Sequence, residues 1–60
     1  MNNSVTFFKP ETLAEVWQVP QETIWKLIRA GKLKAIKLGR LYRIPLEAKL
    51  EYEERFLSHV

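Results

Sequence analysis

The chain has 60 residues, of which 47% are hydrophobic and 28% are charged, and it has a net charge of +3 and no cysteine. This length allows one domain with a small core, and the composition is that of a globular domain. The sequence excludes disulfide bonds and thiolate metal sites, and no apolar run approaches the ~18 residues that a membrane-spanning helix needs.

The positive charge is concentrated in the middle of the chain. Residues 26–43 contain seven basic residues and no acidic one, whereas residues 1–25 and residues 44–60 each have a net charge of −2. Such a local positive field attracts polyanions.

The first half of the chain predicts two helices joined by a short turn. Residues 1–5 are expected to form a flexible lead-in. Pro10 suits the first turn of a helix, and apolar residues follow it at helical spacing, which predicts a helix over residues 10–18. Pro20 can open a second helix, and Gly31 supplies a C-terminal stop for it.

A β-hairpin is predicted over about residues 33–44, because apolar and basic residues alternate around a central glycine. The register that we expect pairs Leu38 with Tyr42 across a three-residue loop. Pairing Leu38 with Leu41 instead would put Arg43 among the apolar residues, since a one-residue shift moves each side chain to the other face. The expected register collects the apolar residues on the face opposite Lys37 and Arg43, namely Ile36, Leu38, Tyr42 and Ile44.

A C-terminal helix is predicted over about residues 46–57, because Pro45 ends the hairpin and good helix formers follow it. Helical spacing gives this helix two apolar stripes on nearly opposite sides. One stripe contains Ala48, Tyr52 and Phe56. The other contains Leu46, Leu50 and Leu57.

The predicted order of helix, turn, helix, hairpin and helix is that of a small α+β winged helix-turn-helix domain, which would occupy residues 1–60. Three segments, PETLAE, TIWKLI and GKLKAIKLGRLYRIP, resemble at matching spacing the excisionase family of small DNA-binding domains, which are relatives of the MerR-type winged helix. The resemblance covers residues 8–48. This chain departs from it at Lys9 and Pro20, where the family has capping Ser or Thr, and at Gln18, where the family has glycine; a lost cap costs about 1 kcal/mol.

The resemblance implies a recombination directionality factor, which binds and bends attachment-site DNA and directs an integrase toward excision of a mobile element or prophage. The implied partners are double-stranded DNA, side-by-side copies of the protein on that DNA, and an integrase, with a tyrosine recombinase as the expected class. It also implies that Ala48 and Tyr52 face the core. The stripe of Leu46, Leu50 and Leu57 is then expected to contact a partner, and the alternative is that it wraps the core of a very small domain.

Helical spacing places five residues of the second helix on its outward face or at its start, and these are the expected recognition residues: Gln21, Glu22, Trp25, Lys26 and Arg29. The alternative is an ordinary solvated face. Trp25 can instead fold back over the hairpin. For Glu22 we expect an ion pair with Lys26 rather than an interaction with a cytosine.

The hairpin supplies four further candidate DNA contacts: Lys34, Lys37, Arg40 and Arg43. Arg40 follows Gly39 at the tip, where a slim turn fits a narrow minor groove with strong negative potential. A simple turn with a solvated arginine is the alternative. Lys32 and Lys34 are expected near phosphates rather than at base edges.

Catalysis is not expected, because the sequence has no nucleophile and base set, no phosphate-binding glycine loop and no metal-ligand spacing. His59 is expected to be a solvated tail residue, and no cofactor or metal is predicted. We expect a cytoplasmic, nucleoid-associated protein. Two alternatives stay open: a small transcriptional regulator, and a protein interaction module such as an antitoxin or adaptor.

Overall fold

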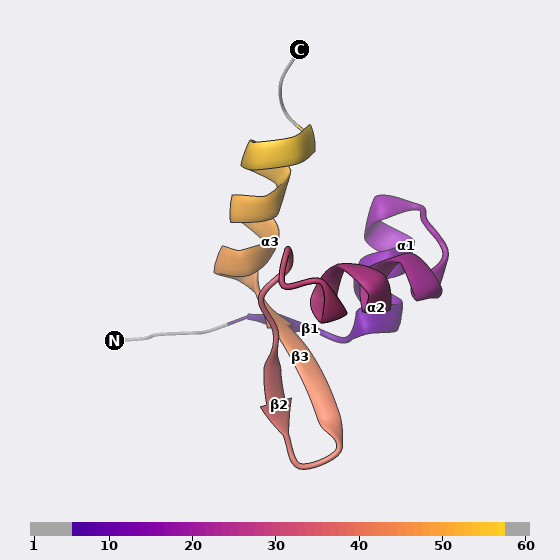
Figure 1. Ribbon diagram of the computed structural model, residues 1–60, viewed down its shortest axis with the longest axis vertical. Helices are drawn as coiled ribbons and strands as arrows, with labels where there is room; N and C mark the ends of the chain where they lie inside the picture. Colours follow the sequence, from indigo (N-terminus) through magenta and orange to yellow (C-terminus); the bar gives the residue numbers. More distant parts are fainter. Residues whose placement is uncertain (1–5, 58–60) are drawn as a thin grey trace.

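The computed structural model describes residues 6–57. Within them the chain forms three helices and a three-stranded antiparallel sheet (Figure 1), which confirms the predicted α+β winged helix-turn-helix class. Residues 1–5, the expected lead-in, lie outside the described residues. The elements in chain order are β1 (Phe7–Phe8), α1 (Pro10–Trp17), α2 (Gln21–Arg29), β2 (Ile36–Leu38), β3 (Leu41–Pro45), α3 (Leu46–Tyr52) and a π-helical segment (Glu53–Leu57).

The helix-turn-helix unit forms without side-chain caps. Neither Lys9 nor Pro20, which precede α1 and α2, makes a capping hydrogen bond, as their side chains predict. Gln18 ends α1 in the left-handed conformation, with φ of 59°, and its backbone N–H donates to the carbonyls of Ala14 and Glu15. The turn therefore requires the backbone conformation that glycine adopts most easily, although glutamine occupies the position.

The core joins all the main elements in one small cluster. Four side chains are between 0 and 2% exposed: Leu13, Ile24, Leu33 and Ile44. They come from α1, α2, β3 and the loop before the hairpin of β2 and β3, which is the wing. Ala14 and Ala48 complete the buried hydrophobic cluster, and Pro10 at the start of α1 is also buried. Because the cluster needs a residue from each of these elements, it fixes α2 relative to the base of the hairpin.

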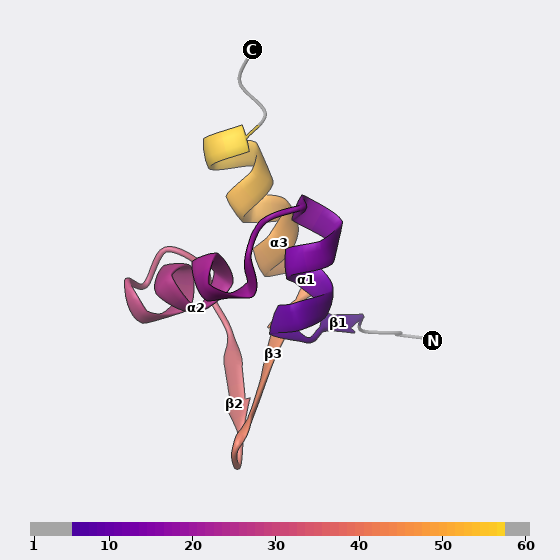
Figure 2. The same cartoon turned by 90° about the vertical axis from the view of Figure 1, so that its right-hand side faces the viewer.

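The hairpin does not have the register that we expected from the sequence, but the alternative one. Leu38 pairs with Leu41, and Ile36 pairs with Arg43, across a two-residue turn of Gly39 and Arg40. Gly39 has φ of 65°, which matches the glycine-first turns that suit the twist of a hairpin. Burial could not select the register, because the hairpin projects beyond the core (Figure 2) and Ile36, Leu38 and Leu41 are all exposed.

This register changes which side chains share a face. Lys37 is opposite Tyr42, and its Nζ lies 6.0 Å from the centre of the Tyr42 ring. Arg43 is on the other face, with Ile36, Leu38 and Leu41. The prediction that Lys37 and Arg43 share a face was therefore wrong, as was the single apolar face of Ile36, Leu38, Tyr42 and Ile44.

A third strand, β1, was not predicted. Phe7 pairs with Pro45 and Phe8 with Ile44, and the N–H of Leu46 donates to the carbonyl of Thr6 at 2.9 Å. The strand has two residues, so it carries no alternation by which the sequence could reveal it. It ties the start of the described chain to the base of the wing.

The predicted C-terminal helix is α-helical only as far as Tyr52 and continues as the π-helical segment, and its predicted inward side is covered only in part, because Phe56 is 42% exposed. Ala48 is buried, and the Tyr52 ring packs 5.1 Å from that of Trp17 and 4.8 Å from that of Phe56. On the other side, Leu46 and Leu50 are 37% and 50% exposed. The side chain of Leu57 lies outside the described part of the chain.

A polar contact also holds this helix against α1. The Trp17 indole N–H donates to Glu53 Oε2 at 2.7 Å, and Lys49 Nζ lies 2.7 Å from the same oxygen. The hydrogen bond from Lys49, followed by that from Trp17, lowers the pKa of the Glu53 carboxyl. The contact forms where the α-helix gives way to the π-helical segment.

Candidate nucleic-acid interface

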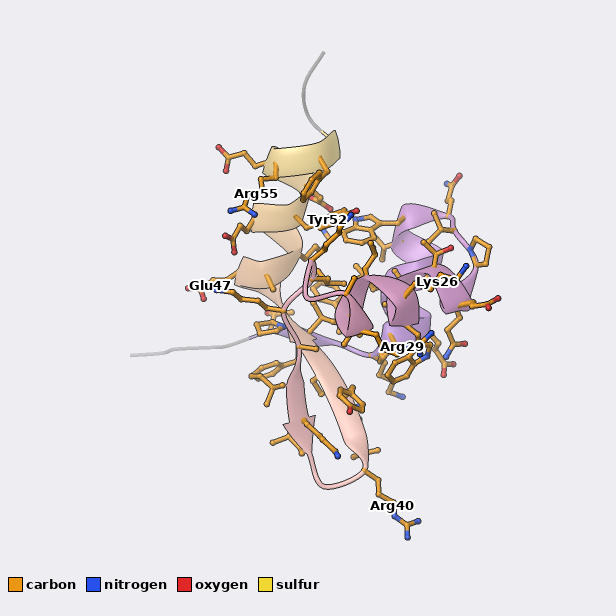
Figure 3. All side chains as sticks on the ribbon, in the orientation of Figure 1. Lys26, Arg29, Arg40, Glu47, Tyr52 and Arg55 are labelled. Carbon is orange, nitrogen blue, oxygen red and sulfur yellow. The ribbon has the colours of Figure 1, made fainter. Side chains whose placement is uncertain are left out.

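The outward face of α2 carries exposed polar side chains, as predicted. Gln21, Glu22, Lys26 and Arg29 are all exposed. Lys26 and Arg29 project from the helix in Figure 3, and Arg40 lies at the far end of the wing in the same view. No ion pair joins Glu22 to Lys26 in the described chain, so the expected pairing was wrong. The Glu22 carboxylate is therefore free to accept a hydrogen bond from a partner.

Trp25 folds back over the wing, which is one of its two predicted positions. Its ring lies 5.1 Å from the Tyr42 ring in an edge-to-face arrangement, with 90° between the planes. Such aromatic pairs are worth about 0.5–1.5 kcal/mol beyond the area that they bury. The Lys37 ammonium lies over the same Tyr42 ring. The row of Trp25, Tyr42 and Lys37 fixes the wing relative to α2.

A groove of about 290 Å³ lies between the wing and the N-terminal ends of α1 and α2. Its lining brings together Gln21 and Trp25 from α2 with Arg40 and Arg43 from the wing, although they are far apart in the sequence. The half-buried Arg43 donates from its guanidinium to the Tyr42 carbonyl at 2.8 Å, which holds the arginine at β3.

The groove also contains residues that the sequence did not identify as candidates. Lys9, Pro10 and Glu11 line it from the start of α1. Lys9 was noted only for the cap that it fails to provide, and a cation close in sequence to Glu11 gives no separate charge signal. Its place beside the wing depends on the packing of α1.

Two of the predicted basic contacts lie elsewhere. Lys32 and Lys34 line a separate hollow of about 140 Å³ between the loop that precedes the wing and α3. Arg55, from the π-helical segment, lines the same hollow together with Glu51. The structure therefore does not bring Lys34 together with Arg40 and Arg43, and it adds Arg55 as a basic neighbour that the sequence argument missed.

Among residues 6–57, no His, Cys, Asp or Glu residues cluster in threes around a possible metal position. His59 lies outside the described residues. No described helix has the length and apolarity to cross a membrane.

The geometry is that of a recognition helix flanked by a basic wing, and a comparison with known families agrees with it. The family model described as "Helix-turn-helix domain" matches residues 7–55, from β1 into the π-helical segment. No curated protein and no solved structure matches the chain significantly. Since the match spans most of the chain, the protein belongs to the helix-turn-helix domain family, which is a family of DNA-binding domains.

Proposed function

We propose that this protein is a sequence-selective, double-stranded DNA-binding accessory protein of the excisionase type. In this role it bends attachment-site DNA and directs an integrase, of the tyrosine recombinase class, toward excision of a mobile element or prophage. It contributes no chemistry of its own and needs no cofactor, because the integrase cuts and joins the strands. It works on DNA in the cytoplasm, associated with the nucleoid.

The observation that carries this proposal is the convergence of α2 and the wing on one groove. Gln21 from the start of α2 and Arg40 and Arg43 from the wing line the same hollow, while Lys26 and Arg29 are exposed on α2. A helix in the major groove and an arginine-tipped hairpin in the adjacent minor groove is a pairing that suits B-DNA, whose major groove admits a helix.

The residue roles follow from these positions. Gln21 and Glu22 start α2, where recognition helices present side chains to base edges; Glu22, free of Lys26, accepts from cytosine N4. Lys26 and Arg29 bind phosphates or a guanine edge. Trp25 contacts DNA only with the part of its ring that Tyr42 leaves uncovered.

The wing residues divide by position. Arg40, at the exposed tip, enters the minor groove, and Lys37 and Arg43 flank it on opposite faces of the hairpin. Lys34, in the hollow with Arg55, binds phosphates of DNA that bends toward α3. Phosphate contacts of this kind set affinity, whereas base contacts set selectivity.

The proposed assembly uses the exposed side of α3. Leu46 and Leu50 are apolar and exposed, and Leu57 belongs to the same stripe as predicted from the sequence, although its side chain lies outside the described part of the chain. We assign them to contacts with side-by-side copies or with the integrase. The same exposure favours a second candidate function, an interaction module such as an antitoxin or adaptor. A transcriptional regulator would need the same α2 and wing surface.

The test begins with selection of duplexes from a random pool by the wild-type protein, followed by titration of the selected duplex by fluorescence anisotropy. Arg29→Ala should reduce the preference for the selected sequence over a scrambled one. Arg55→Ala removes the same charge outside the groove, so it should weaken both duplexes alike. Failure to enrich any sequence would refute DNA recognition. Normal enrichment, with no stimulation of excision when an integrase of the tyrosine recombinase class is added in a reconstituted reaction, would refute only the excisionase role.

A further inference from the structure

The tip of the wing carries two exposed leucines that the core does not use. Leu38 and Leu41 face each other across the turn of Gly39 and Arg40. They are 56% and 54% exposed, more than any other exposed large hydrophobic side chain in the described chain. Only the two-residue turn lies beyond them, so they form the apolar end of a narrow projection (Figure 2).

The fold of the hairpin does not require these leucines. Ile44 anchors the base of the wing and is fully buried, and Tyr42 holds the wing against Trp25. Leu38 and Leu41 lie on the face opposite Tyr42, so they take no part in the contact between the two rings, although Leu41 also lines the groove beside them. Large apolar side chains that remain this exposed beside one another indicate a contact surface.

The charge around the leucines identifies the partner. Arg40 lies between them in the turn, Lys37 directly precedes Leu38, Arg43 is two residues beyond Leu41 on the same face, and residues 26–43 contain no acidic residue. An apolar protein surface would not require so many cations. The minor groove of DNA offers both complements, since phosphates line its rims and stacked base pairs form its floor. It also accepts a projection as slim as a two-residue turn.

We propose that Leu38 and Leu41 form an apolar wedge that enters the minor groove beside Arg40 and partly unstacks one base step. This inference rests on the proposed function and supplies its bending mechanism. Apolar side chains inserted in this way kink a duplex by about 20–90° toward the major groove. Pyrimidine–purine steps unstack most easily, so the wedge should select such a step beneath the wing without reading its bases by hydrogen bonds.

The central variant is the double substitution Leu38→Thr and Leu41→Thr. Threonine keeps a high β propensity, so the hairpin should persist while the wedge loses its apolar end. The matched control is Ile36→Thr, which makes the same kind of change on the same face of β2 but farther from the tip. Circular dichroism and thermal melting confirm that each variant is folded.

The probe is the selected duplex at a length of about 30 bp, which is short against the persistence length of about 150 bp, with a donor and an acceptor dye at its ends. Binding of wild type or of Ile36→Thr should shorten the end-to-end distance of the duplex, as measured by energy transfer between the dyes. The double variant should still bind, with lower affinity, and its bend angle should be smaller than that of wild type by at least about 20°. A second duplex with one unpaired adenine beneath the wing is already unstacked, so it should restore much of the lost affinity of the double variant.

Each other outcome overturns the wedge in a distinguishable way. If the double variant bends the duplex as wild type does, the leucines do not enter the stack. If it bends single sites normally but fills adjacent sites less cooperatively, the leucines contact a neighbouring protein. If the wild type binds no duplex, the proposed function fails and the wedge fails with it. If all variants bind and the bend angle does not depend on the leucines, the wedge fails but the proposed function stands.

Discussion

Replacing Gln18 with glycine should stabilise the domain, because the turn between α1 and α2 holds this residue at φ of 59°. A residue with a Cβ in the left-handed region is disfavoured by roughly 1–2 kcal/mol. Glycine removes that penalty but loses more backbone freedom on folding, which costs about 0.5–1 kcal/mol. The Gln18 side chain is exposed and its backbone hydrogen bonds remain. The net gain should be about 0.5–1 kcal/mol, since the strain term is the larger.

Thermal melting measures this gain directly. For a domain of this size, 1 kcal/mol corresponds to about 4–8 °C, so Gln18→Gly should raise Tm by about 2–8 °C. Gln18→Ala is the matched control, because it removes the same side chain but keeps the Cβ, and it should show no comparable gain. Gly31→Ala reverses the test: φ is 78° and an added Cβ would meet nothing within 4 Å, so any loss of Tm must come from the backbone. An unchanged Tm for Gln18→Gly, or an equal rise for Gln18→Ala, would refute the argument.

Four further predictions address charge, groove shape, pH and the leucine stripe. Lys34→Ala and Lys37→Ala should each flatten the plot of log affinity against log salt by about 0.9 for every duplex tested, and a salt-independent affinity would contradict both phosphate contacts. Arg40→Ala should weaken binding most where the minor groove is narrow, and changing A·T pairs to G·C there should have the same effect; equal losses on both duplexes would make Arg40 a phosphate contact. The pKa of the Glu53 carboxyl is lowered in the folded state, so its contribution to stability is complete above the unfolded-state pKa and is lost as pH falls through the folded-state pKa. Glu53→Gln should therefore flatten the acidic part of a plot of Tm against pH. An unchanged plot would show that the contact with Trp17 and Lys49 is weak. Leu50→Ser should leave Tm and single-site binding nearly unchanged but reduce cooperative filling of adjacent sites, whereas a fall in Tm would indicate that the half-exposed leucine covers the core.

The helical half of the fold follows from signals that act over a few residues. Pro10 and Pro20 restrict φ at their own positions, Gly31 permits the left-handed conformation that follows α2, and the apolar spacing between them selects helices. The bounds of α1 and α2 therefore agree closely with those predicted. Even the strain at Gln18 was visible in the sequence, because the family that the chain resembles has glycine at this position. The basic segment could also be read directly, because charge is a property of composition.

The register of the wing and the existence of β1 required the tertiary structure. Burial is a reliable guide to register only where a strand crosses the core, and the wing extends beyond it, so its apolar residues did not constrain the pairing. The turn geometry at Gly39 decided the register instead. In β1, Phe7 and Phe8 form a strand only because residues 44 and 45 are beside them.

The candidate interface divides along the same line. Sequence alone identified the exposed cations of α2 and the wing, since helical spacing and a turn motif place them without knowledge of the rest of the fold. It did not show that Trp25 meets Tyr42, that Lys9 reaches the groove, or that Lys34 and Arg55 line the same hollow. Each of these arrangements joins elements that are separate in the chain, so each depends on how the core packs them together rather than on any local preference.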